Sequence, residues 1–577
     1  MQRSSLQSVG FAILFTLLVA SCILLDIPLL HDSHLMSKWF GCYAIVFVLS
    51  ALLFWWSSSR CTSIRITDLT ILAFAIYIFV IDYGRGDLSE TVLLRGASLL
   101  LLYLIFRQSI DGKLLDACLA ICFVLAFAVA MWGIVQFALA VVRGDSLSTA
   151  VVGNYDNPAG YALTLSLSLP IGVHLLRIPE RFESQRFCIA IALGIVALSL
   201  ALSLSRTGWL SMLCIGIYAL LIWGKRRRLC IGLVIGVSVL VFIVCCLYKQ
   251  DSTDGRSYIA HCTCQQIIDS PWWGHGHYGF SVGYMECQAD YLSSHPDSRF
   301  AWLADNIHHP LNEWLYFCVR YGIVGCLLLV GILFSLIPSI RCEVVEKSIL
   351  PVGFLVAIFP FTLFSYPLQY PLTWVMLIIS LGTQARHTKE ILHISVRRLI
   401  PTLSLLLACG IALLLYRSIY AELEWYDVAT RSLSGQTRYV MPRYEELYKH
   451  LKDSPHFLYN YAAELNYIGE YTRSQQILDE CMLKMNDYDT HLLAASNHEH
   501  MDNHGLAELH LRKASAMCPV RFVPLYQLTK LYGKMGRSEE QRQLAQQIMD
   551  KEVKVPSQRI TEIKDEMRYI LEDTDFK

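Results

Sequence analysis

Thirteen long apolar runs occupy most of the first 417 of the 577 residues, and they limit the folds open to this chain. A helix needs about 20 apolar residues to cross a lipid bilayer. Because lipid offers no hydrogen bonds to the backbone, such long runs cross it as helices. The sequence therefore predicts an all-α polytopic membrane protein with about 12–13 transmembrane helices. The runs are 9–30, 38–56, 66–82, 91–106, 115–141, 161–176, 187–204, 207–223, 229–248, 314–339, 349–364, 369–384 and 399–417.

Two of these runs are less regular than the others. Pro367 and Pro371 interrupt the apolar stretch between 361 and 384. At the N-terminus, Val19-Ala20-Ser21-Cys22 resembles a lipoprotein cleavage site, but the apolar run continues to Leu30. We therefore expect an uncleaved first helix rather than a signal peptide.

Composition divides the chain into two domains. Over the whole chain 54% of residues are hydrophobic and 17% are charged, whereas soluble domains have about 25% charged residues. The residues after 417 are rich in charged side chains, which predicts a membrane domain at 1–417 and a soluble domain at 418–577. The formal net charge of zero gives no reason to expect nucleic-acid binding.

Lysine and arginine predict the orientation of the membrane domain. If the N-terminus is cytoplasmic, the interior loops hold eighteen of these residues and the exterior connections hold four, namely Lys38, Arg85, Arg143 and Arg206. Positive charge collects on the cytoplasmic side of membrane proteins. The segment 249–313 and the C-terminal domain are therefore both expected on the outer face.

The segment 249–313 is an external polar loop, and we expect it to be the working part of the molecule, because long loops in compact proteins are usually functional or disordered. It contains Gly255-Arg256, Pro271-Trp272-Trp273-Gly274-His275-Gly276-His277, and a His308–Asn312 stretch that leads into Glu313 and Trp314. Two further polar stretches, 153–160 and 203–208, are expected on the same face.

Arginine and histidine are the candidate chemical groups. The planar guanidinium of Arg206, in a tight turn, suits phosphate oxygens, although an arginine at a helix end also serves as a membrane anchor. Arg256 and Arg320 are further candidates. His308 or His309 could take a proton from a hydroxyl or could cap the following helix, and Asn312 and Glu313 form a polar patch beside them.

Metal and disulfide alternatives stay open for the same loop. His275 and His277 together with His308 and His309 could bind a divalent metal, and His261-Cys262-Thr263-Cys264 could begin a metal site. Cys287 could instead form a disulfide with Cys262 or Cys264 if the loop faces an oxidising compartment.

The soluble domain has a period of about 34 residues. Units begin near Pro455, Tyr488 and Phe522. Ala507, Ala514 and Pro519 have the spacing of a tetratricopeptide repeat, so the domain resembles a short array of this kind. The helix pairs could bind a protein partner or an acceptor, or could form a solenoid without a ligand.

The order of the motifs resembles the O-antigen ligase superfamily over about residues 66–385. Gly255-Arg256, Pro271 to Gly276, and Asn312 followed by Gly322 and Gly325 are similar to its signature loop. The segment Gly153 to Ala162, which contains Asn157, is similar to its G-x-x-x-N-P-x-x-x-A segment, and Ser205-Arg206 matches its Ser-Arg turn.

One position departs from the family pattern. The usual His-Asn pair would place histidine at 311, where this chain has Leu311. His309 lies three residues before Asn312, as in the His-Pro-His-Asn variants. The resemblance therefore carries the catalytic role to His309.

The resemblance implies a GT-C-like membrane enzyme of the bacterial inner membrane, with its loop and C-terminal domain in the periplasm. It implies inverting, metal-independent transfer without a cofactor, from a glycan on undecaprenyl pyrophosphate to a hydroxyl on lipid A core, a second glycan or a protein. Arg206 would be catalytic together with His309, the proton acceptor. The substrate-binding set would be Arg256, Arg320, His308, Asn312, Glu313, Trp273 and Asn157.

Other functions fit the sequence less well. A ligase is favoured over a polymerase or a protein O-oligosaccharyltransferase because the soluble repeats suggest docking of something other than a second lipid-linked glycan. A transporter or flippase would carry polar sites near the bilayer midplane, often in repeated halves. A membrane assembly factor would have no need of ordered polar motifs on the outer face.

Overall fold

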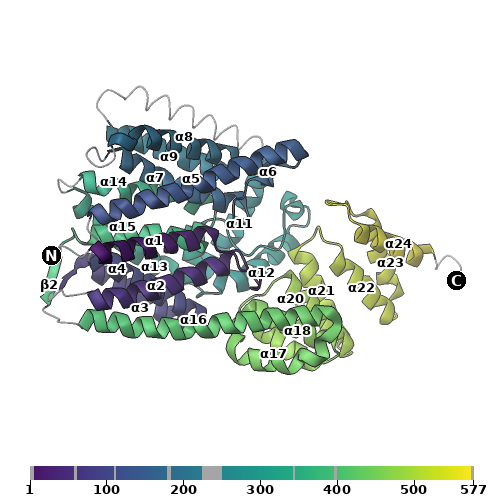
Figure 1. Ribbon diagram of the computed structural model, residues 1–577. Helices are drawn as coiled ribbons and strands as arrows, with labels where there is room; N and C mark the ends of the chain where they lie inside the picture. Colours follow the sequence, from purple (N-terminus) through teal and green to yellow (C-terminus); the bar gives the residue numbers. More distant parts are fainter. Residues whose placement is uncertain are drawn as a thin grey trace.

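The computed structural model describes residues 5–56, 62–108, 112–177, 183–223, 250–341, 345–394 and 399–572. Its fold is all-α, with a bundle of apolar helices at one end and a helical domain at the other (Figure 1). The helices before the soluble domain are α1 (Ser5–Leu24), α2 (Leu35–Trp56), α3 (Ile66–Arg85), α4 (Glu90–Gln108), α5 (Gly112–Arg143), α6 (Leu147–Ala150), α7 (Pro158–Arg177), α8 (Arg186–Leu202), α9 (Arg206–Trp223), α11 (Gln250–Asp269), α12 (Gly279–Ser294), α13 (Glu313–Arg341), α14 (Val345–Phe364), α15 (Pro371–Ala385) and α16 (Leu399–Arg431).

The apolar runs of the sequence correspond to these helices. Each predicted run forms a helix of the bundle, except 229–248, which lies outside the described residues. By length and composition, seven helices among the described residues can cross a membrane, namely α1, α2, α3, α5, α7, α13 and α16. The all-α polytopic membrane fold is therefore confirmed.

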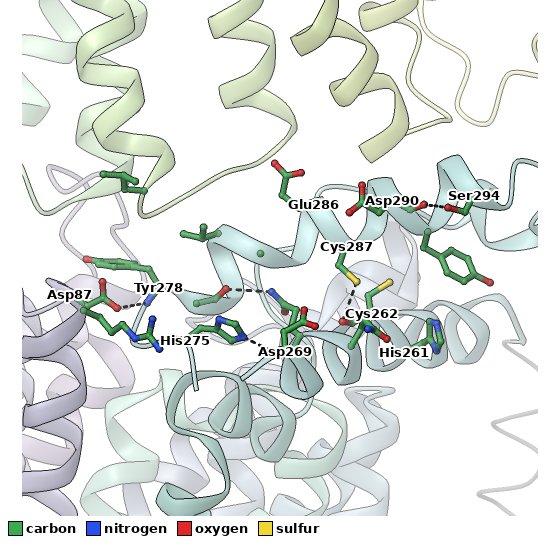
Figure 2. A pocket seen from close by; sticks show the side chains of 18 of the residues that line it. Asp87, His261, Cys262, Asp269, His275, Tyr278, Glu286, Cys287, Asp290 and Ser294 are labelled. Carbon is green, nitrogen blue, oxygen red and sulfur yellow. Dashed lines mark hydrogen bonds between the residues drawn. The ribbon is translucent and has the colours of Figure 1, made fainter. Parts of the chain in front are cut away.

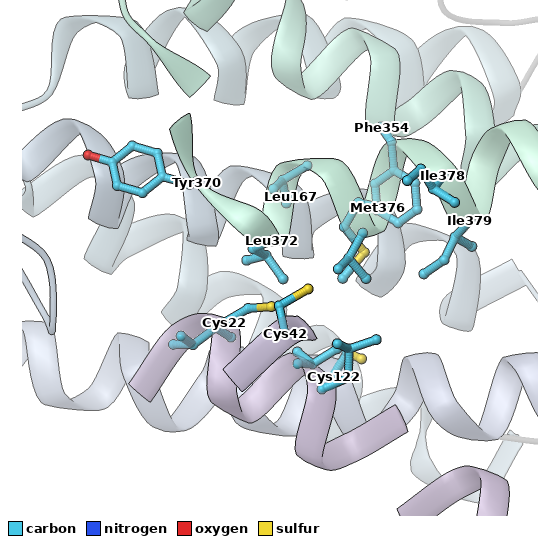
Figure 3. Packing of buried hydrophobic residues seen from close by; sticks show 14 of the residues in the cluster. Cys22, Cys42, Cys122, Leu167, Phe354, Tyr370, Leu372, Met376, Ile378 and Ile379 are labelled. Atoms are coloured by element: carbon cyan, nitrogen blue, oxygen red, sulfur yellow. The ribbon is translucent and has the colours of Figure 1, made fainter. Parts of the chain in front are cut away.

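The core of the bundle is a single cluster of buried apolar side chains. It joins α1, α2, α4, α5, α7, α8, α9, α14, α15 and α16, and Figure 3 shows part of it around Cys42, Met376 and Phe354. Helices approach closely where small residues meet, since a Cβ added at Gly41 would lie 2.8 Å from the Cβ of Ser21. Close approach through small residues is the usual way that helices pack in membranes.

The polar region, residues 250–312, is mostly helical rather than the loop expected from the sequence. It consists of α11, α12 and a 3₁₀ turn, η2 (Arg299–Trp302). Tyr258, Phe280 and Tyr284 are buried in a small core of their own. The prediction of a loop was wrong because this region buries its apolar residues against the soluble domain, and the sequence gives no sign of that contact.

Helix α16 leaves the bundle and continues without a break into the soluble domain, across the boundary predicted at residue 417 (Figure 1). A π-helical turn, η4 (Ser432–Gln436), then leads into α17. The remaining helices are α17 (Thr437–Leu451), α18 (Pro455–Tyr467), α19 (Tyr471–Met482), α20 (Tyr488–His500), α21 (His504–Met517), α22 (Val523–Lys534), α23 (Ser538–Asp550) and α24 (Gln558–Glu572).

The soluble domain is attached to the polar region by a buried hydrogen bond, an exposed ion pair and a shared apolar cluster. Gln288 of α12 donates a hydrogen bond to the Met517 carbonyl at 2.7 Å, and Arg521 pairs with Asp305 at 2.7 Å. Side chains from α12, α20 and α21 share one apolar cluster. The domain therefore supports the polar region directly.

A short antiparallel ribbon closes the opposite end of the bundle. Strand β1 (Thr62–Arg65) pairs with β2 (Glu390–Ile394), and Ile64 lies opposite Leu392. In Figure 1, β2 lies at one end of the bundle, and α11, α12 and the soluble domain lie at the other. The polar region and the soluble domain therefore share one end, as the sequence predicts.

Candidate functional site

The glycine-rich segment 271–276, here called the clasp, repairs a break in α13. The helix is interrupted at Gly322, whose φ of 61° and ψ of −170° suit glycine alone. The His275 N–H donates to the Val319 carbonyl at 2.7 Å, and the Ile323 N–H donates to the Pro271 carbonyl at 2.8 Å. The clasp therefore satisfies backbone groups that the break exposes inside an apolar helix.

Close packing between the clasp and the break requires two glycines. A Cβ at Gly274 would lie 2.5 Å from the Arg320 carbonyl carbon, and one at Gly322 would lie 2.3 Å from the Trp272 carbonyl oxygen. Such distances leave no room for a side chain. The motif noted in the sequence thus has a structural role, which is to hold Arg320 and the start of α13 in place.

Arg320 is enclosed by groups of the protein itself. Its Nη2 donates to the Tyr321 hydroxyl at 3.1 Å and contacts Nδ1 of His277, and its guanidinium lies over the Tyr316 ring. The Tyr321 hydroxyl donates to the fully buried Asp82 at 3.2 Å. Burial and the positive charges of Arg320 and Arg95 hold the pKa of His277 well below its usual range, so its Nδ1 can accept.

His309 is buried, with 8% of its surface exposed. Its Nδ1 accepts a hydrogen bond from the Leu311 N–H at 2.9 Å, and its Nε2 lies 3.9 Å from Oε2 of Glu313. Burial and the nearby Arg320 lower the pKa of His309 to about 3. The ring is therefore neutral at pH 7. Because Nδ1 accepts, the ring proton lies on Nε2, which faces Glu313.

Asn312 and Glu313 fix the start of α13. The Asn312 Oδ1 accepts from the N–H groups of Trp314 and Leu315, each at 3.0 Å, which is the geometry of a helix cap. The Glu313 Oε1 accepts from the Leu368 N–H at 2.9 Å. Glu313 is buried beside His309 and keeps its second oxygen directed to that ring.

Two tyrosines that the sequence did not indicate connect Asn157 to His309. The Asn157 Nδ2 donates to the hydroxyls of Tyr366 and Tyr370, at 2.8 and 3.0 Å. The Tyr366 ring lies 5.4 Å from the His309 ring, centre to centre. Both tyrosines flank the prolines that made this stretch irregular, and aromatic residues beside such a break were the available signal.

Arg206 and Arg256 lie close enough for their charges to repel each other. Arg206 is the first residue of α9, after a turn in which Leu204 has a φ of 51° and Ser205 Oγ accepts from the Gly208 N–H. Burial and the positive charge of Arg206 lower the pKa of Arg256 on α11. Two guanidiniums thus meet at the positive end of a helix dipole, an arrangement that favours an anion.

The side chains of His308 and Trp273 are exposed, in contrast to those of His309 and Glu313. His308 is exposed and lies close enough to His456 and Asp489 of the soluble domain to influence their pKa values. Trp273 is 56% exposed, and its ring lies 6.3 Å from that of Tyr77. Exposed tryptophan beside apolar helices is typical of a membrane interface.

A pocket of about 750 Å³ opens between α11 and α12 (Figure 2). His261, Asp269, His275 and Asp290 line it, together with Tyr278, whose hydroxyl donates to the Asp453 carbonyl of the soluble domain at 2.8 Å. None of the nine side chains predicted as site residues lines this pocket. In the described part of the chain, no group of three or more His, Cys, Asp or Glu residues has the arrangement of a metal site.

Residues 191–330 match the family described as O-antigen ligase. The matched stretch contains Arg206, Arg256, the clasp, His309 and Arg320. The resemblance to the O-antigen ligase superfamily is thus confirmed here, and it indicates membrane glycan transfer of the ligase or polymerase type. The match does not reach the soluble domain, so the tetratricopeptide likeness stays a prediction. No curated protein matches the chain.

Proposed function

We propose that this protein is a glycosyltransferase of the bacterial inner membrane that moves a preassembled glycan from undecaprenyl pyrophosphate to an acceptor hydroxyl on the periplasmic face. The observation that carries the proposal is the pair Arg206 and Arg256 at the start of α9. Departure of a lipid pyrophosphate places negative charge on the leaving group, and fixed positive charge lowers the barrier to that step.

The acceptor hydroxyl must lose a proton as it attacks the anomeric carbon. The sequence predicts His309 as the proton acceptor, but we assign the proton to Glu313, with His309 as the donor beside it. Because the His309 Nδ1 already accepts from Leu311, its Nε2–H is a donor that orients the hydroxyl or the carboxylate. Oε2 of Glu313 then accepts the proton while the bond to the pyrophosphate oxygen breaks, and attack from the opposite face inverts the sugar.

Asn157 and Tyr366 support this pair, and the transfer is proposed to need no metal. The contact between Tyr366 and His309 fixes one face of the imidazole, while Asn157 holds the tyrosine hydroxyl. The soluble domain rests on the polar region, so it lies where an acceptor would arrive. That position supports ligation to lipid A core or another glycan over polymerisation.

Transfer in proteoliposomes that contain undecaprenyl-pyrophosphate glycan tests the proposal. We expect Arg206→Ala and Arg256→Ala each to lower the rate about 10²- to 10³-fold, as loss of one transition-state donor does. Glu313→Gln should lower it by a similar factor. Arg299→Ala is the matched control, since Arg299 is an exposed arginine of the polar region.

Full transfer by folded Arg206→Ala and Arg256→Ala proteins would refute the assignment of both arginines. Loss of transfer on chelation would refute the metal-independent mechanism. The product separates the acceptors, because a ligase joins the glycan to the lipid A core and a polymerase lengthens the carrier-linked glycan.

A further inference from the structure

Two pairs of cysteines lie close together around the clasp. Cys287 of α12 faces Cys262 of α11, with its Sγ 3.5 Å from the Cys262 carbonyl oxygen (Figure 2). Cys318 and Cys326 of α13 approach to 3.1 Å between their sulfur atoms. Cys264, two residues from Cys262, is exposed instead.

The Cys318–Cys326 contact depends on the break in α13. In a straight helix, residues eight apart are separated by about 12 Å along the axis, at 1.5 Å per residue. The non-helical backbone at Gly322, midway between the two cysteines, brings the sulfur atoms together. The contact is therefore a property of the clasped conformation.

We propose that Cys262–Cys287 and Cys318–Cys326 form disulfides when this end of the molecule enters an oxidising compartment, and that the two bonds lock the clasp. One bond would join the helices on either side of the clasp, and the other would close the break that the clasp repairs. The inference uses the periplasmic orientation proposed above, because disulfides persist in that compartment and are reduced in the cytosol.

The first pair has an accessible nucleophile. Cys287 is partly exposed and lines the pocket of about 750 Å³, which gives an oxidant a way in. A hydrogen bond from the Cys262 thiol lowers the pKa of Cys287 and so stabilises its thiolate. Cys262 is fully buried behind it and acts as the resolving thiol.

The oxidation is a thiol–disulfide exchange with a protein disulfide as oxidant. The Cys287 thiolate attacks one sulfur of that disulfide and forms a mixed disulfide, and the other sulfur leaves as a thiolate. Cys262, after losing its proton, attacks the Cys287 sulfur and releases the second thiolate of the oxidant. Each bond formed removes two electrons and two protons from this protein and reduces one disulfide of the oxidant.

The bonds would hold three site residues in one unit. Arg256 is on α11, Arg320 lies between Cys318 and Cys326, and His309 precedes the same helix. The clasp already connects these elements through backbone hydrogen bonds. The disulfides would restrict the unfolded and locally opened states of this region. Reducing them should therefore make a protease cut the segment between α11 and α12 about tenfold faster or more.

Thiol trapping of the full-length protein tests the inference. Cells are quenched in acid, free thiols are alkylated with N-ethylmaleimide under denaturing conditions, and the purified protein is digested without reduction for mass spectrometry. We expect linked peptides for Cys262–Cys287 and Cys318–Cys326. Alkylation of all four cysteines in this first step would overturn the proposal.

A matched pair of variants identifies the partner of Cys287. Cys264→Ser should leave the Cys262–Cys287 peptide intact, whereas Cys262→Ser should leave Cys287 open to alkylation. A Cys264–Cys287 peptide in the unmodified protein would overturn the assignment even if the variants fail to fold. Because the readout needs no glycan, a bonded protein that transfers nothing contradicts only the proposed transferase. An active protein with four free thiols contradicts only the disulfides.

Discussion

Arg320 and the pair Arg206–Arg256 occupy the same end of the molecule in opposite surroundings. Arg320 contacts His277, the Tyr321 hydroxyl and the Tyr316 ring. The Tyr321 hydroxyl in turn donates a hydrogen bond to Asp82. Burial and the repulsion of Arg206 instead lower the pKa of Arg256. Arg320, whose charge is balanced within the protein, maintains the structure. Arg206 and Arg256, which repel each other, form a site that suits an incoming anion.

Replacing Arg320 should have the largest effect on stability. Arg320→Leu removes the cation near the fully buried Asp82, and breaking a buried charge network costs about 3–5 kcal/mol. Arg256→Ala removes a repulsion and should leave stability unchanged or slightly higher. The free energy of unfolding in detergent, measured for both variants, checks the contrast, and equal losses would remove the distinction between the two environments.

Gly322→Ala should come next, with a loss of about 3 kcal/mol in the free energy of unfolding. The backbone conformation costs an alanine about 1–3 kcal/mol, and the added Cβ would overlap the Trp272 carbonyl oxygen. Gly331→Ala in the same helix is the control, since a Cβ there meets nothing within 4 Å. A Gly322→Ala protein as stable as the control would mean that the clasp does not hold the break.

His309 should make stability fall as the pH is lowered. Its folded pKa of about 3 lies below the usual 6.5, so the unfolded chain binds the proton first. The stabilisation is complete above pH 6.5 and is lost progressively as the pH falls from 6.5 to 3. Between pH 7 and 5 the loss is about 2 kcal/mol.

The free energy of unfolding, measured at pH 7 and at pH 5, checks this effect. Between these two values the His309→Gln variant should lose about 2 kcal/mol less of this free energy than the unmodified protein does. His295→Gln, at an exposed position, should behave as the unmodified protein does. A His309→Gln protein with an unchanged pH dependence would show that the ring titrates normally.

Breaking the surface ion pair Arg299–Asp254 should have the smallest effect on the free energy of unfolding. The Arg299 side chain is 72% exposed and its nitrogen lies 3.4 Å from Asp254. Such pairs contribute about 0–1 kcal/mol and weaken in salt. Arg299→Ala should therefore change the free energy of unfolding by less than about 1 kcal/mol, and a larger loss would show that exposed charges in the polar region also maintain structure.

The bundle could be predicted because apolar length alone determines a membrane helix. Even the run interrupted by Pro367 and Pro371 separates into α14 and α15. The ribbon between Thr62 and Ile394 could not be predicted, since its two strands are short and lie far apart in the sequence. The sequence also gave no clear indication of the helices α11 and α12, because their apolar side chains are buried against residues of the soluble domain.

The site was predictable in its residue types and not in its connections. The sequence indicated Arg206 and Arg256, but their proximity depends on how α9 and α11 pack. It indicated His309, but not the Leu311 N–H that determines which ring nitrogen carries the proton. Tyr366 was missed because its role arises from contacts with Asn157 and His309, which lie far from it in sequence.

The continuous helix α16 also has a mechanical consequence. Over 33 residues it measures about 50 Å, and it packs on α2 and α4 before it enters the soluble domain. A straight helix sets both the distance and the relative orientation of the parts at its two ends. Each inserted residue lengthens it by about 1.5 Å and rotates one end relative to the other by about 100°. Inserting one or two alanines after Arg417 would therefore shift the soluble domain along the helix axis and rotate it about that axis. The sequence of the domain itself would stay unchanged.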